Sequence, residues 1–137
     1  MIQDQQKAQG PHGPSFNYAS HVFIVTDLEE AQRYYSDVLG FAVDGEFVMR
    51  DGVQFLFKES KVEGAVRPNR RVGVELDTYI WVDDVNAVYQ EFKASGANII
   101  FGPENMAYRM RDLIVEDLYG YRLCFGAPLG LESEETR

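Results

Sequence analysis

Three side chains with binding chemistry lie at every second position of one apolar segment. Asp77, Tyr79 and Trp81 alternate with other residues as in a strand, whose successive side chains point to opposite faces. Ile80 and Val82 have the parity that would pack on a following helix. The other face would then carry a carboxylate and two aromatic rings, a combination that binds planar or cationic organic molecules. A plain aromatic core is the alternative for this pattern.

Three reactive side chains are weaker candidates for catalysis or metal binding. Cys124 has no His or Lys beside it in the sequence, and a free buried cysteine usually behaves as a small hydrophobic residue. His21 shares strand parity with Phe23 and Val25, which favours a core or rim histidine, although a one-residue bulge would reverse its direction. Asp77 could be a general base if desolvated, but a carboxylate hydrogen-bonded at a strand end is more usual.

The elements that position these residues follow in a regular order. The run 20–25 predicts a buried strand, and Asp27 occupies the N-cap position of a helix that Gly40 ends. Asp-Gly pairs at 44–45 and 51–52 then separate short alternating runs, which is typical of β-hairpins. The first half of the chain therefore predicts one strand, one helix and a meander of strands.

The same order recurs in the second half of the chain. Asp84 lies 57 positions after Asp27 and caps a second predicted helix, whose apolar positions keep the same spacing. Gly40 and Gly96, the closing glycines, are 56 positions apart, which predicts a second helix one residue shorter. A repeat in register across cap and apolar face predicts an α+β fold of two tandem β-α-β-β-β modules. We expect them to form a cup-shaped mixed sheet with helices on its outer face.

The repeat also sets the predicted boundaries. They are a single two-module domain at 17–127, with modules at about 17–59 and 75–127, a linker at about 60–74, a mobile N-terminal tail at 1–16 and a C-terminal tail at 128–137.

Composition limits the class of protein. The 137 residues include 13 Lys and Arg against 22 Asp and Glu, which leaves a formal net charge of −9. Nucleic acids and anionic membranes require a cationic surface, so neither is expected as a partner, whereas a cationic ligand is compatible. The single cysteine excludes an intrachain disulfide. No apolar run has the length of a membrane span and the start lacks a secretory signal, so we expect a cytoplasmic protein.

Several motifs together resemble one superfamily. Segment 21–41, with its Tyr-Tyr pair and Leu-Gly-Phe ending, is similar to the opening of the vicinal-oxygen-chelate superfamily of glyoxalases, extradiol dioxygenases, fosfomycin-resistance enzymes and bleomycin-resistance proteins. Segment 79–97 resembles the strand and helix of its second module. Segment 111–126 resembles its closing hairpin, with Asp-Leu-Tyr-Gly-Tyr in place of the usual Asp-Pro-Asp-Gly-Tyr. The resemblance covers roughly 18–127 and is greatest to the bleomycin-resistance-like branch.

The resemblance also indicates where a metal would lie. Catalytic members hold a divalent metal through four strand positions, filled by His, Glu or Gln. Carried over to this chain, those positions are Ser20, Asp77, Cys124 and either Phe55 or Leu56. These four side chains together do not form a suitable ligand set for any common metal ion. The resemblance therefore implies a protein without metal or other cofactor, and a divalent metal is the alternative.

A cup of this kind would be lined by one face of each strand. If Ser20 faces the cup, alternate residues of its strand do so too. The candidate ligand-binding residues are Ser20, Val22, Ile24, Asp77, Tyr79, Trp81, Tyr108, Met110, Arg111 and Cys124. No residue is assigned a catalytic role.

Three functions are compatible with these features. The first is a metal-free protein that binds and sequesters a hydrophobic, drug-like molecule, which could be cationic. Since bleomycin-resistance proteins are usually dimers with ligand clefts shared between subunits, the resemblance then implies a homodimer. The second is a glyoxalase-like lyase or isomerase with a non-standard or absent metal site. The third is a structural or regulatory domain whose cavity is filled by its own side chains.

Overall fold

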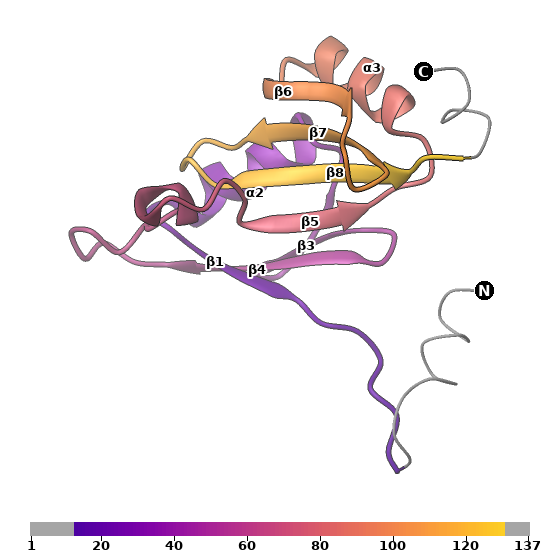
Figure 1. Cartoon of the computed structure of the whole chain (residues 1–137). Coiled ribbons are helices and arrows are strands. Elements are labelled where there is room, and N and C mark those ends of the chain that lie inside the picture. Colours follow the sequence, from indigo (N-terminus) through magenta and orange to yellow (C-terminus); the bar gives the residue numbers. More distant parts are fainter. Residues whose placement is uncertain (1–12, 131–137) are drawn as a thin grey trace.

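The computed structural model describes residues 13–130 and consists of two consecutive modules of the same kind (Figure 1). The first module contains β1 (His21–Val25), α2 (Leu28–Asp37), β2 (Ala42–Asp44), β3 (Phe47–Arg50) and β4 (Val53–Glu59). The second contains β5 (Thr78–Trp81), α3 (Val85–Ser95), β6 (Asn98–Asn105), β7 (Met110–Glu116) and β8 (Arg122–Pro128), and a short 3-10 helix, η1 (Asn69–Val72), lies between the modules. The predicted α+β fold of tandem β-α-β-β-β modules is confirmed.

Each module forms one four-stranded mixed sheet. The strand orders, β1-β4-β3-β2 and β5-β8-β7-β6, are equivalent. In both sheets the first strand runs parallel to the fourth, and the remaining pairs are antiparallel. His21 pairs with Phe55 in the first sheet, and its repeat counterpart Thr78 pairs with Leu123 in the second. The internal repeat therefore extends from the sequence to the strand register.

Both helices begin at the predicted aspartates. The backbone N–H of Glu30 donates to Asp27 Oδ1 at 3.0 Å, and that of Ala87 donates to Asp84 Oδ1 at 3.1 Å. Each bond satisfies one of the amide groups that the first turn of a helix leaves unpaired. The predicted Asp-Gly turns are also present, where β2 leads into β3 and β3 leads into β4.

The predicted relative length of the helices is wrong. Helix α2 has 10 residues and α3 has 11. Gly96 follows α3 directly and caps it in the left-handed conformation, with φ of 87°. Gly40 also has positive φ, at 78°, but two residues outside the helix separate it from the end of α2. The spacing of the glycines therefore measures the whole helix-to-strand connection rather than the helix.

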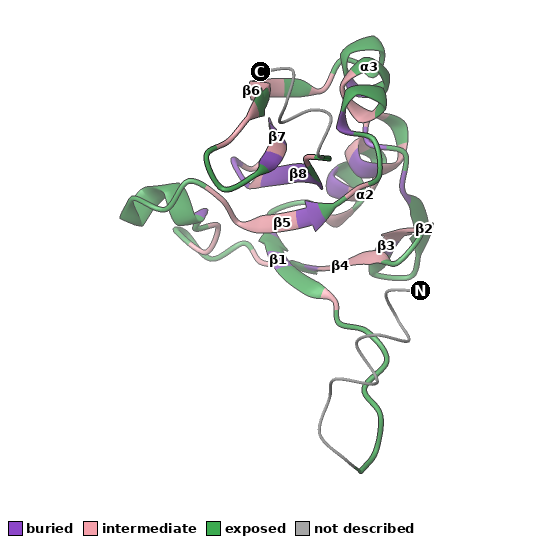
Figure 2. Cartoon of the chain, turned by 45° about the vertical axis from the view of Figure 1, so that its right-hand side comes forward, coloured by how far each residue is buried: buried purple, intermediate pink, exposed green. Residues whose placement is uncertain are grey.

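One continuous core joins the two modules. It includes apolar side chains of both helices and of strands from both sheets. The ring of Phe23 in β1 stacks on Tyr121, just before β8, with centroids 4.1 Å apart. Figure 2 shows much of β8 and parts of β7 and of both helices as buried. The side chains on the other face of each sheet lie outside this core.

Some predictions concern regions at or beyond the edge of the described chain. Most of the predicted N-terminal tail, residues 1–12, and residues 131–137 of the predicted C-terminal tail lie outside the described residues. Within residues 13–130, no helix has both the length and the apolar character needed to cross a membrane.

Candidate ligand-binding site

Strand β5 directs two aromatic side chains away from the core. Ile80 is buried in the core cluster, whereas Trp81 is 67% exposed. Tyr79 shares the parity of Trp81, and the two rings meet edge to face with centroids 5.7 Å apart. The predicted alternation of β5 is present, and it leaves an indole and a phenol ring on the face opposite α3.

Asp112 of β7 is the polar centre of this face. The residue is only 2% exposed, and both carboxylate oxygens have partners. The Tyr79 hydroxyl donates to Oδ1 at 2.6 Å, and the Tyr108 hydroxyl donates to Oδ2. A buried carboxylate with two phenol donors is well satisfied. Each phenol hydroxyl donates its hydrogen to Asp112. The lone pairs of the phenol oxygen therefore remain available as hydrogen-bond acceptors for other molecules.

Burial and the Asp112 carboxylate keep the neighbouring groups protonated. Burial, followed by the bond to Asp112, raises the pKa of Tyr79. The hydrogen bond to Asp112 raises the pKa of Tyr108 to about 12. Burial, with a further contribution from Asp112, raises the pKa of Cys124 to about 12. Since only the thiolate is a good nucleophile, Cys124 is poorly suited to attack a substrate at neutral pH.

Gly126 of β8 makes room for this arrangement. It pairs with Trp81 across the β5–β8 ladder. A Cβ at this position would overlap the Tyr79 hydroxyl and lie 2.6 Å from Asp112 Oδ1. A glycine inside a strand often marks such a close approach. We name the group formed by Tyr79, Trp81, Tyr108, Asp112, Cys124 and Gly126 the Asp112 cluster.

Sequence reasoning missed Asp112 and Gly126 as members of the site. Strand parity carries a signal for Asp112, which lies two positions after the candidate Met110. The glycine inside the apolar run of β8 was a second signal. Neither residue identifies its partners without the pairing of β5, β7 and β8.

Ser20 lies close to part of the cluster. Its hydroxyl donates to Gln54 Oε1 of β4 at 2.8 Å. Together with Tyr79 and Trp81, these side chains line a hollow of about 460 Å³ between the first sheet and β5. The hollow and the Asp112 cluster therefore bring together five of the predicted ligand-binding residues, which are Ser20, Tyr79, Trp81, Tyr108 and Cys124.

Val22, Ile24 and Asp77 line a different hollow, of about 550 Å³. Asp77 is fully engaged there, since Oδ1 accepts the Asn69 amide and Oδ2 accepts the Arg122 amide, both at 2.8 Å. These bonds fasten η1 and the start of β8 to β5. Asp77 thus has the hydrogen bonds of a strand-end carboxylate.

The two remaining candidates are neighbours at the start of β7 and differ in direction. Met110 is buried at the start of β7. Arg111 donates at 3.0 Å to Asn86 Oδ1 of α3 and to Asn105 Oδ1 of β6. These partners place its guanidinium toward α3, on the other face of the sheet. His21, as expected from its parity, meets Phe23 edge to face at 4.6 Å.

The sequence matches one protein-family model over most of its length. The sequence model described as "Glyoxalase/Bleomycin resistance protein/Dioxygenase superfamily" matches residues 17–125. The chain belongs to this superfamily. Membership in the glyoxalase/bleomycin resistance protein/dioxygenase superfamily agrees with the resemblance read from the sequence motifs and with the tandem modules of the fold.

Solved structures share the superfamily fold at low sequence identity. TioX from Micromonospora sp. ML1 matches with a TM-score of 0.66 and 19% identity, covering 83% of this chain and 100% of TioX. TnmS3 from Streptomyces sp. CB03234, described as an antibiotic binding protein, matches with 0.67 and 18%, covering 85% and 99%. A superfamily member from Sphaerobacter thermophilus matches with 0.63 and 20%, covering 82% and 98%. The search of curated proteins gave no match.

The four superfamily metal positions are poorly suited to a metal in this chain. The Ser20 hydroxyl is bonded to Gln54, and both Asp77 oxygens are taken by backbone amides. The Cys124 thiol is held protonated. The fourth position is Leu56, because Val22 pairs with Leu56 as Tyr79 pairs with Cys124. Within residues 13–130, no group of three or more His, Cys, Asp or Glu could hold a metal ion. These donors do not fit a divalent cation.

Proposed function

We propose that this protein binds a small organic molecule at the Asp112 cluster and sequesters it without chemical change. The observation that carries the proposal is a buried carboxylate held by the hydroxyls of Tyr79 and Tyr108, next to the exposed indole of Trp81. The fold likeness to TnmS3, whose description is an antibiotic binding protein, supports a binding role.

The chemistry of the cluster favours a planar ligand that carries hydrogen-bond donors or a positive charge. The rings of Tyr79 and Trp81 offer π faces, which attract flat molecules and cations. The phenol oxygens offer lone pairs backed by the negative charge of Asp112. A ligand amine or ammonium would thus meet acceptors, while an anion would meet repulsion.

We further propose that binding requires no metal. The support is the donor set at the superfamily positions, in which one residue is apolar Leu56 and the others are engaged or protonated. Elemental analysis of the dialysed protein should find less than a stoichiometric amount of zinc, iron, nickel or manganese. About one such ion per chain, with binding that is lost on chelation, would contradict this part of the proposal.

The binding proposal is tested by titration with a panel of aromatic drug-like compounds in cationic and neutral forms. Trp81 is the single tryptophan, so its fluorescence reports the site directly. We expect saturable quenching, a raised melting temperature and full recovery of the unchanged compound. Replacing Tyr79 and Tyr108 together by Phe should weaken binding several-fold, whereas Tyr89→Phe on α3 should not. Conversion of a bound compound into product would show that the protein is an enzyme instead.

A further inference from the structure

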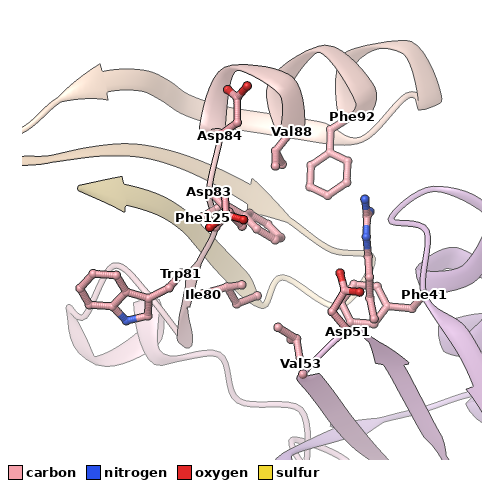
Figure 3. A pocket seen from close by; sticks show the side chains of 13 residues that line it. Phe41, Asp51, Val53, Ile80, Trp81, Asp83, Asp84, Val88, Phe92 and Phe125 are labelled. Carbon is pink, nitrogen blue, oxygen red and sulfur yellow. The ribbon is translucent and has the colours of Figure 1, made fainter. Parts of the chain in front are cut away.

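We propose that the cleft between the two modules is a second binding site, which takes small organic cations with an apolar body. The cleft is a cavity of about 480 Å³, lined by residues of β3, β4, β5, β8 and α3 and by the segments that follow α2, β3 and β5 (Figure 3). Its volume lies in the range of pockets that hold drug-sized molecules. It is separate from the Asp112 cluster, although Trp81 stands at the border of both.

The floor of the cleft is apolar and comes from both modules. Phe41 and Val53 belong to the first module, while Ile80, Phe92 and Phe125 belong to the second. Phe92 and Phe125 meet edge to face with centroids 5.1 Å apart. Figure 3 shows these side chains around the cavity, with the indole of Trp81 pointing away from it. An apolar group placed here would remove its own carbon surface from water by contact with side chains of both modules.

The rim of the cleft is acidic. Three of its lining residues are carboxylates, Asp51, Asp83 and Asp84. Asp84 Oδ1 is committed to the N-cap of α3, where it offsets the positive end of that helix. Asp51 follows β3 and Asp83 follows β5, so the two approach the cavity from different modules (Figure 3). Within the described range 13–130, neither of these two forms an ion pair, although the charge of Asp51 also acts on the neighbouring Arg50.

Arg50 is the positively charged residue in the lining of the cleft, and the carboxylate of Glu91 already balances its charge. Arg50 makes two hydrogen bonds to the carboxylate of Glu91 on α3, at 2.7 and 2.9 Å. It also donates to the Leu39 carbonyl at 2.9 Å. The bond to Glu91 is the main reason that the pKa of Arg50 is raised. With Arg50 held in this way, Asp51 and Asp83 set the charge preference of the cleft, which is for a cation.

The test uses three compounds with one apolar tail and different head groups. They are 4-phenylbutylamine, 4-phenylbutanol and 4-phenylbutyrate, which are a cation, a neutral molecule and an anion at pH 7. Each is titrated into the full chain, and backbone amide NMR shifts of Phe41 and Val88, which line the cleft and not the hollow beside Ser20, report on the cleft. We expect the amine to bind at least about five-fold more tightly than the alcohol, and the acid not to saturate.

Matched variants assign the preference to the two carboxylates. The double change Asp51→Asn and Asp83→Asn should bring the affinity for the amine to within about two-fold of that for the alcohol. Asn suits the Asp51 position because it tolerates the left-handed backbone found there, with φ of 53°. Asp44→Asn, in the other Asp-Gly turn, is the control and should leave the preference unchanged. If the double variant fails to fold, the salt dependence of the unmodified chain replaces it, since only the amine should weaken with added salt.

Three results would overturn the proposal. One is equal affinity for amine and alcohol, and another is a preference that survives in the double variant. The third is loss of the amine-induced shifts at Phe41 and Val88 when Tyr79 and Tyr108 are changed to Phe, which would assign the binding to the Asp112 cluster. Conversely, persistence of those shifts in the Phe variant supports a second site, even if the Asp112 cluster binds nothing.

Discussion

At the scale of single residues, Trp81 separates a binding role from a packing role. Its indole is mostly exposed, so Trp81→Ala should lower the free energy of unfolding by less than about 1 kcal/mol. Loss of a stacking surface should nevertheless weaken ligand binding by roughly 0.5–2 kcal/mol. Urea denaturation and fluorescence-independent calorimetry measure the two effects. Leu118→Ala, another exposed apolar side chain, is the control. A stability loss of about 3–5 kcal/mol would instead identify Trp81 as a core residue.

Gly126 is the residue on which the Asp112 cluster depends sterically. Gly126→Ala would push the Tyr79 hydroxyl away from Asp112 and leave a buried carboxylate oxygen without its partner. We expect a loss of roughly 1–3 kcal/mol in the free energy of unfolding, together with weaker ligand binding. Gly130→Ala, where an added Cβ meets nothing within 4 Å, should change neither. Equal stability of the two variants in urea would count against the described geometry.

The sequence was informative about side-chain direction and less so about side-chain partners. Alternation along one strand correctly separated Ile80 from Trp81, because period two is a local property of an extended chain. Asp112 and Tyr79 are 33 residues apart, and their bond depends on the order in which β5, β8 and β7 lie in the sheet. Such a contact follows from topology, which a single strand does not encode.

At the scale of elements, the turn between β7 and β8 is held by a buried carboxylate. Asp117 accepts hydrogen bonds from the Tyr35 hydroxyl at 2.6 Å and from the amides of Tyr119 and Tyr121 at 2.8 and 2.9 Å. Despite these bonds, burial raises the pKa of Asp117 from 3.8 to about 6. Asp117 thereby connects the turn to α2 through Tyr35. Because its pKa is raised, it also makes the stability of the folded chain depend on pH.

The sign of that coupling gives a prediction. Between pH 4 and 6 the folded chain holds a proton on Asp117 that the unfolded chain releases, so stability from this group falls as pH rises. From pH 4 to 7 the unmodified chain should lose on the order of 2 kcal/mol relative to Asp117→Asn. Urea denaturation of both proteins across this range measures the difference. Parallel stability curves would show that the Asp117 pKa is not raised.

The elements themselves were largely predictable, since their signals are local. Both N-caps and both Asp-Gly turns were identified because each depends on a few neighbouring residues. Helix length was misjudged, because Gly40 ends a connection that continues beyond α2. The register of β4 could not be fixed from the sequence, since Phe55 and Leu56 are both apolar. Pairing with β1 settles it, with Phe55 in the core and Leu56 on the other face.

At the scale of the whole molecule, several apolar side chains of the single chain are exposed to solvent. Phe16 and Tyr18 are 94% and 72% exposed, on the segment that leads away from the body toward the N-terminus (Figure 1). Val22, Ile24 and Phe47 are also exposed. Strand β1 lies at an edge of its sheet, and such an edge can pair with another chain. Exposed apolar groups beside an open edge are typical of a surface that a partner covers.

We therefore expect a homodimer in which these residues contact the second copy. Light scattering at micromolar concentration should give a mass near twice the 15.6 kDa of one chain. Replacing Phe16 and Tyr18 together by Ser should shift the population toward the monomer, because it removes apolar area from the interface. Ile100→Ser, at an exposed position of β6 in the second sheet, is the control and should leave the dimer intact. A mass near 15.6 kDa for the unmodified chain would mean that these aromatic side chains remain in water or contact a different molecule.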